Sequence, residues 1–343
     1  MPVAANRDPT IRFGGSVFSD HRRAVRVLAA TVVFGLAGTL AVSTARGTGP
    51  NETPDARGER IIHEADQKVR AKDFDAAAAA TDAVWKTRSS IPDDVALAAI
   101  RNTDLTPETR TFMVDVLAGK NQRPVANDKV KGLLRDHAVD DAVKVKVLVD
   151  FEFEPGDAAM LQQLTQTDDA LGFHALKKLS EVEPAAGVDL ARQFLKQPLK
   201  MSDLRISGAF KAVVRSNQFK QDPALRNELI AWASEVLQGS AFSASAKESA
   251  TFALAETRSM SSLKIILDKQ TDPIMIAGAV DENAQVLLEV LTDCVDPADV
   301  TLVAGALMTH PINELADPLT NCARKLGNKQ ISEAAKRVAA RTA

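Results

Sequence analysis

Tyrosine is absent from these 343 residues, and phenylalanine and tryptophan together bring the aromatic content to only 4%. Glycine and proline are also scarce, with 17 and 15 residues, and only two cysteines occur. A β-sandwich or barrel needs β-branched and aromatic strands joined by frequent glycine turns, and a collagen-like or proline-rich disordered chain needs far more glycine and proline. The composition therefore excludes these classes.

Alanine is abundant instead. It occurs 55 times, and it has the highest helix propensity of all residues, whereas aromatic residues are poorer helix formers. The chain as a whole is 45% apolar and 25% charged, as ordinary globular proteins are. We therefore expect an all-α protein, and its length predicts two domains or one elongated array.

Linear catalytic and metal-binding motifs are absent from the sequence as well. The five histidines (His21, His63, His137, His174 and His310) are scattered, and no H-E-x-x-H, C-x-x-C, glycine-rich phosphate loop or G-x-S-x-G occurs. We expect His174 to be half-buried or hydrogen-bonded in the core, and His63 and His137 to lie on the surface. The sequence predicts no catalytic residue, no metal ligand and no cofactor.

The longest uncharged run covers residues 27–45. As a helix with a rise of about 1.5 Å per residue it would span roughly 28 Å, close to the thickness of a hydrocarbon core. Five arginines and two aspartates precede it in residues 1–26, and the positive-inside rule places this basic leader in the cytoplasm. We expect a transmembrane signal anchor and an extracytoplasmic C-terminal part.

Two other interpretations of this run stay open. Ser43 and Ala45 fit the small residues before a signal-peptidase site, so that cleavage near Ala45 would leave a secreted protein. A buried core helix is the third interpretation. Residues 46–55 contain glycine and proline but no large apolar residue, and they are expected to be a flexible linker.

The rest of the chain shows signals for helix starts. A capping Asp or Thr before a proline in the first helical position is one such signal, and a pair of aspartates at the helix N-terminus is another. The first signal occurs at residues 106–107, 222–223, 272–273, 296–297 and 317–318, and the second at 93–94, 140–141 and 168–169. Apolar residues recur at helical spacing between them, which predicts about sixteen helices of roughly 9 to 17 residues. The run from Val143 to Val147 alternates like a strand, but we expect it to be helical.

The starts of comparable helices at residues 140, 168, 202, 243 and 272 are 28 to 41 residues apart, which is the range of helix-pair solenoids. SASAKESATFALAETRSMSSLKIILDK (243–269) and DDALGFHALKKLSEVEPAAGVDLARQFLKQ (168–197) resemble HEAT repeats, in which a small-residue helix is followed by a turn and a helix ending in aliphatic residues. The resemblance covers about residues 93–326, although the usual Asp and Arg pair is missing. It implies a right-handed α-solenoid of antiparallel helix pairs within residues 89–343.

Residues 56–88 follow a different pattern. ADQKVRAKDFDAAAAATDAVWKTR resembles one tetratricopeptide hairpin, in which a turn precedes an aromatic residue and an alanine-rich second helix. A single hairpin of this kind does not stand alone, so we expect it to cap the start of the array.

Charge is distributed unevenly behind the net charge of −3. Residues 190–220 contain seven basic residues against Asp203 alone, whereas residues 268–317 contain ten acidic residues against Lys269 alone. Such runs are ordinarily solvated faces, but they also fit a surface that binds an oppositely charged protein or peptide partner. We expect such a partner to contact four residues of the basic segment, namely Lys196, Arg205, Lys211 and Arg215.

Nucleic acid is not an expected partner, because the part after the leader is acidic and no groove-reading motif occurs. The sequence thus predicts a scaffold rather than an enzyme. The alternative is an envelope hydrolase or lyase whose His174 or His310 meets carboxylates from distant helices. A stalk or sensor domain is a third hypothesis. Cys294 and Cys322 are either one disulfide, as an oxidising compartment permits, or two small buried residues in neighbouring helices.

Overall fold

The computed structural model describes residues 52–119, 124–167 and 170–342. In this part of the chain nineteen α-helices and three short 3-10 helices form the fold, and the β pairing there is limited to one isolated bridge between Val125 and Glu152. The expected all-α class is confirmed. The helices outnumber the predicted sixteen because short ones such as the five-residue α12 (Asn217–Gln221) carry too few residues to show a periodicity.

The predicted leader (1–26) and apolar run (27–45) lie outside the described residues. Among the residues that are described, no helix is both long enough and apolar enough to cross a bilayer. The first described helix begins at Pro54, so the last two residues of the expected linker belong to it.

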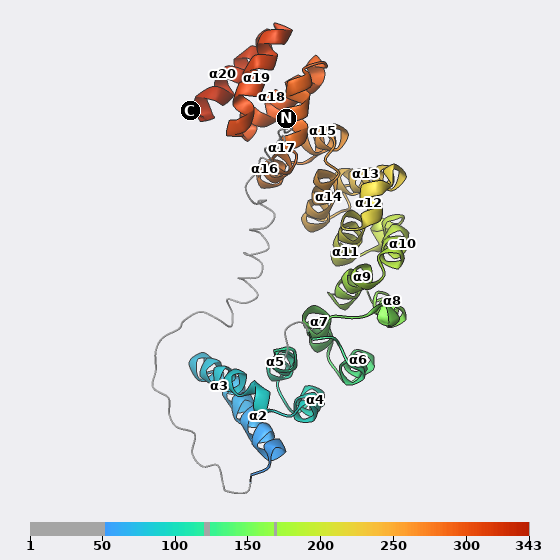
Figure 1. Ribbon diagram of the computed structural model, residues 1–343, viewed down its shortest axis with the longest axis vertical. Helices are drawn as coiled ribbons and strands as arrows, with labels where there is room; N and C mark the ends of the chain where they lie inside the picture. The colour runs from blue at the N-terminus through green and yellow to red at the C-terminus, as the bar shows by residue number, and fades with distance from the viewer. Residues whose placement is uncertain (1–51, 120–123, 168–169, 343) are drawn as a thin grey trace, which may run out of the picture. The chain divides into compact units, whose positions relative to one another are not determined.

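The described chain forms two compact units, residues 52–253 and 254–342. The helices of the first unit (Figure 1) are α2 (Pro54–Arg70), α3 (Phe74–Lys86), α4 (Asp93–Arg101), α5 (Pro107–Ala118), α6 (Asp128–Arg135), α7 (Asp141–Asp150), α8 (Ala158–Leu164), α9 (Ala170–Val182), α10 (Pro184–Leu195), α11 (Asp203–Val214), α12 and α13 (Pro223–Gln238), with the 3-10 helices η1 (Arg88–Ser90), η2 (Pro155–Asp157) and η3 (Pro198–Lys200). The next helix, α14 (Ala244–Glu256), runs across the boundary. The second unit continues with α15 (Met260–Lys269), α16 (Pro273–Glu282), α17 (Ala284–Asp293), α18 (Pro297–Thr309), α19 (Asn313–Leu326) and α20 (Lys329–Thr342).

Four of the eight predicted helix starts are confirmed as capped starts. The side chains of Asp222, Asp272 and Asp296 each accept a hydrogen bond of 2.8 Å from the backbone N–H two residues later, with proline in the first helical position. The hydroxyl of Thr106 caps α5 by accepting a hydrogen bond of 3.3 Å from the N–H of Thr109, three residues later. The run from Val143 to Val147 lies within α7 and is helical, as expected.

Three predicted starts differ in the structure. Pro318 lies inside α19, because the buried face of that helix runs through it from Leu315 to Cys322, and the helix gives up the hydrogen bond to the carbonyl of residue 314. At α4 the N-cap is Pro92, and the two aspartates follow it in the first turn. At α7, Asp140 is the N-cap residue, but its carboxylate pairs with Arg110 at 2.5 Å. The pair at 168–169 lies outside the described residues.

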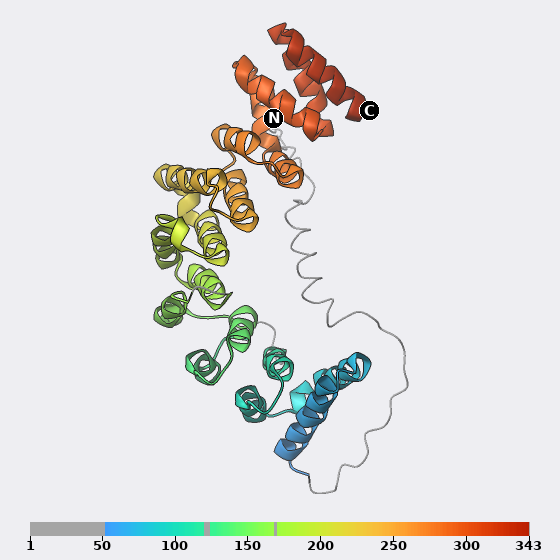
Figure 2. The ribbon, with the colours of Figure 1, turned by 180° about the vertical axis from the view of Figure 1, so that it is seen from behind.

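Helix pairs are the building blocks of the first unit. Here α4 packs on α5, α6 on α7, α8 on α9 and α10 on α11, and the second helices α5, α7, α9 and α11 contact one another in chain order (Figure 1, and from behind in Figure 2). Small residues allow close packing within this arrangement. A Cβ atom at Gly187 in α10 would lie 2.4 Å from Ser180 Oγ and 2.7 Å from Ser180 Cα in α9.

Polar contacts attach the α2–α3 hairpin to the helices that follow it. The buried carboxylate of Asp66 in α2 accepts hydrogen bonds of 2.7 Å from both the backbone N–H and the hydroxyl of Thr106, and it pairs with Arg70 at 2.5 Å. Arg88 lies over the Trp85 ring, 4.3 Å from its centroid, and donates to the carbonyl of Gly119 at 3.0 Å. The hairpin is therefore anchored to both ends of α5.

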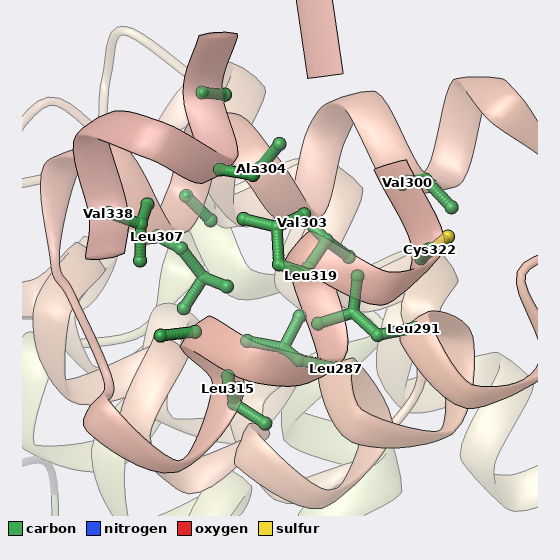
Figure 3. Packing of buried hydrophobic residues seen from close by; sticks show 14 of the residues in the cluster. Leu287, Leu291, Val300, Val303, Ala304, Leu307, Leu315, Leu319, Cys322 and Val338 are labelled. Atoms are coloured by element: carbon green, nitrogen blue, oxygen red, sulfur yellow. The ribbon is translucent and has the colours of Figure 1, made fainter. Parts of the chain in front are cut away.

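Aliphatic side chains from α17 to α20 form the core of the second unit (Figure 3). Leu287 and Leu291 of α17 face Val303 of α18 and Leu319 of α19, and all four are buried. Cys322 lies at the edge of this cluster. Leu263 of α15 and Val280 of α16 belong to the same cluster, so residues of six helices meet in one continuous core.

Candidate functional site

The four cations predicted to bind a partner lie on and just after α10 and α11. Lys196 is the C-cap residue of α10, and Arg215 is the C-cap residue of α11. Both side chains are exposed, whereas Arg205 and Lys211, on α11 itself, are half-buried.

Arg205 holds α11 against two neighbouring elements. Its guanidinium lies over the Phe194 ring of α10, 4.8 Å from the ring centroid. Its Nη2 donates a hydrogen bond of 3.1 Å to the carbonyl of Thr165, the C-cap residue of α8. A cation stacked and hydrogen-bonded in this way contributes to packing as well as to surface charge.

Lys211 is directed toward a different helix. Its Nζ lies 5.3 Å from the centroid of the Phe173 ring in α9. Arg205 and Lys211 are six residues apart, so their positions differ by roughly 120° around α11. The four cations therefore do not converge on one point, although all of them lie on consecutive packed elements.

His174 lies beside this basic region. Its ring meets the edge of the Phe173 ring, with centroids 4.9 Å apart and planes at 87°. Burial lowers the pKa of His174 below its ordinary value, and the charges of Lys177, Lys178 and Lys211 lower it further. The imidazole is consequently neutral near pH 7, and its charged neighbours in this region are mainly cations.

An exposed aliphatic side chain lies between two lysines in the connection from α10 to α11. Leu199, in η3, has 67% of its surface exposed, and the flanking Lys196 and Lys200 are exposed as well. Periodicity cannot identify such a residue, because Pro198 interrupts the helical pattern. The run K-Q-P-L-K is the signal in the sequence that marks this position.

In the second unit, a recess of about 360 Å³ opens between α16 and the end of α18. Its lining residues are Pro273, Ile274, Ala277, Asp281, Thr309 and His310. Ile274 has 65% of its surface exposed.

His310 and Asp281 meet in this recess. The Nε2 atom of His310 lies 2.8 Å from Oδ1 of Asp281, and both side chains are one third exposed. The hydroxyl of Thr309 donates to the carbonyl of Gly305 at 3.2 Å, so it is engaged within its own helix. The recess thus combines an apolar floor with a carboxylate and an imidazole. The sequence predicts His310 as a histidine that could meet a carboxylate from a distant helix, but it could not identify Asp281 as the partner, because the two residues are 29 positions apart.

The two cysteines also lie in the second unit. A disulfide joins Cys294, the C-cap residue of α17, to Cys322 in α19. Both residues are buried, and Cys294 has a left-handed backbone conformation with φ of 52°. The α17–α18 connection is thereby attached to α19.

A second recess lies between α4 and α6 in the first unit and is bridged by ion pairs. Lys129 contacts Asp94 at 2.6 Å, and Arg101 contacts Asp136 at 3.2 Å. Within the described ranges, no group of three or more His, Cys, Asp or Glu side chains is placed to hold a metal ion.

Comparison of the chain with protein-family models, with curated proteins and with solved structures found no match. The likeness to HEAT and tetratricopeptide repeats is therefore a resemblance in the sequence, and packed helix pairs are the part of it that the structure contains.

Proposed function

We propose that the chain is a membrane-tethered or exported helical-repeat scaffold that binds a protein or peptide partner outside the cytoplasm. In this proposal the helix pairs form a right-handed α-solenoid of HEAT-like repeats over about residues 93–326, and the hairpin at 56–88 caps its start. Stacked repeats present long surfaces built from successive helices, and such surfaces are suited to binding extended partners.

The pattern of contacts between helices of the first unit carries this proposal. Each of α5, α7, α9 and α11 packs on the preceding helix of its own pair, and α5 contacts α7, α7 contacts α9 and α9 contacts α11. Nearest-neighbour packing of this kind supports a repeat array, because each unit of a solenoid contacts only its neighbours.

The basic charge of this surface supports the proposal that the partner is acidic. Lys196 and Arg215 are exposed at the C-terminal ends of consecutive helices, and Leu199, three residues after Lys196, adds an exposed apolar side chain. A partner with carboxylates around an aliphatic side chain would fit this surface, and its binding would weaken with salt.

The proposed compartment follows from the N-terminal sequence. The apolar run at 27–45 serves as an anchor, or as a signal peptide cleaved near Ala45. The Cys294–Cys322 disulfide supports an oxidising compartment.

A pull-down from native cells with a C-terminally tagged chain tests the proposal. Lys196→Glu combined with Arg215→Glu is expected to abolish capture of a salt-sensitive partner. Lys329→Glu combined with Lys336→Glu, which reverses two exposed lysines of α20, is the matched control and should leave capture unchanged. Equal capture by all variants, or recovery of the tag in the cytosol, would refute the proposal.

A further inference from the structure

The connection between α10 and α11 presents an apolar side chain framed by positive charge. Leu199 is an exposed apolar residue of a one-turn 3-10 helix, and Pro198 before it is buried and fixes the turn. Lys196 and Lys200 are exposed on either side in the sequence. A pre-ordered turn loses little conformational entropy when it binds, so Leu199 is suited to anchor a contact.

The recess of the second unit has the opposite polarity. Ile274 and Ala277 lie one turn apart on α16 and offer an apolar floor, and Asp281 follows one turn further along the same face. Asp281 uses Oδ1 for His310, which leaves its Oδ2 for another donor. The recess belongs to segment 268–317, which contains ten acidic residues against one lysine, and two of these acids, Glu282 and Asp299, pair with Arg258 and Lys264.

These two surfaces complement each other in charge, and each has an exposed apolar part. One is an exposed leucine between lysines, in a segment with seven basic residues against one acid, and the other is an apolar recess within an acidic segment. We propose that Leu199 of one copy inserts into the α16–α18 recess of a second copy, while Lys196 and Lys200 lie near the carboxylate of Asp281. The chain thus associates with itself head to tail.

The two surfaces are different patches of the same chain, so the contact is heterologous. A pair of copies joined by one contact then retains one free turn and one free recess, and association proceeds to open chains of copies unless the geometry closes a ring. The inference rests on the proposed scaffold function, since it names a second copy as the partner of the basic surface.

Mixing of variants tests this arrangement with the full chain. Wild-type protein is expected to form species larger than dimers in sedimentation velocity, increasingly at higher protein concentration and lower salt. Leu199→Ser and Ile274→Ser should each weaken self-association by at least about tenfold, because each removes one apolar side chain from the contact.

An equimolar mixture of the two variants should recover dimers and nothing larger. The Leu199→Ser copy retains an intact recess, and the Ile274→Ser copy retains an intact leucine, so one contact per pair can form. Val295→Ser is the control: Val295 is 79% exposed in the second unit but does not line the recess, and this variant should associate like the wild type.

Three results would overturn the inference. They are a wild-type chain that stays monomeric at every concentration, a variant mixture that stays monomeric, and a Val295→Ser chain that is weakened as much as Ile274→Ser. A monomeric chain that still captures another protein through Lys196 would refute self-association and leave the scaffold function standing. Failure of both experiments would refute both proposals.

Discussion

Replacing Cys294 and Cys322 together by alanine removes the disulfide between the end of α17 and α19. The bridged residues are 28 positions apart, and a loop of that length gives a chain-entropy stabilisation of about 3.5 kcal/mol. A small domain is typically stable by about 5 to 15 kcal/mol. The disulfide would therefore supply a large fraction of the stability of the second unit.

Hydrogen exchange read by mass spectrometry locates this effect along the chain. Some amide hydrogens of α17 and α19 exchange only when the second unit opens. Their exchange rate should rise by roughly several hundredfold in the double variant, or after reduction of the wild type. Peptides from α4 and α5 in the first unit serve as the internal control. Unchanged protection in α17 and α19, or a larger loss in α4 and α5, would refute the reasoning.

The backbone at Cys294 allows a sharper comparison between two variants. Its φ of 52° lies in the left-handed region, which glycine adopts without the steric penalty that alanine carries. In a Cys322→Ala background, Cys294→Gly should therefore be more stable than Cys294→Ala by about 1 kcal/mol. Urea unfolding followed by circular dichroism measures the difference, and an alanine variant as stable as the glycine variant would contradict the expectation.

Other predictions concern packing and pH. Gly187→Ala should destabilise the first unit by about 1 to 3 kcal/mol in urea unfolding, because the added Cβ would overlap Ser180. Gly305→Ala in α18 should instead stabilise the second unit by up to about 1 kcal/mol, because the added Cβ would meet no neighbouring atom within 4 Å and alanine has the higher helix propensity. Burial raises the pKa of Asp66, but hydrogen bonds from Arg70 and Thr106 outweigh burial and lower this pKa to about 2. Because the folded-state pKa is below the unfolded one, its contribution of about 2 kcal/mol is present above pH 4 and is lost as pH falls toward 2. Asp66→Asn should flatten that part of the stability curve, and an unchanged acid limb would contradict the assignment.

Helix positions could be predicted because a helix carries two local signals in the sequence, namely an apolar repeat and a capping residue at its start. Leu225, Leu229 and Val236 repeat at helical spacing and are buried in α13, and Asp222 before Pro223 marks its start. Pro318 shows the limit of such local reasoning. Its Asp-Pro pair has the same signal, but burial of Leu315 and Leu319 extends α19 through the proline.

The candidate sites could be predicted only in part, because exposure and pairing depend on tertiary packing. The sequence located the basic segment, but the stacking of Arg205 on Phe194 and of Lys211 on Phe173 requires three helices to be in place. The His310–Asp281 pair likewise depends on the packing of α16 against α18.

Photocrosslinking in intact native cells tests the central claim most directly. A photoreactive residue in place of Lys196 should give a discrete adduct with an extracytoplasmic protein or with a second copy of the chain, and the same residue in place of Lys336 should give none. Adducts with cytoplasmic proteins, or no adduct at position 196, would contradict a partner-binding scaffold outside the cytoplasm.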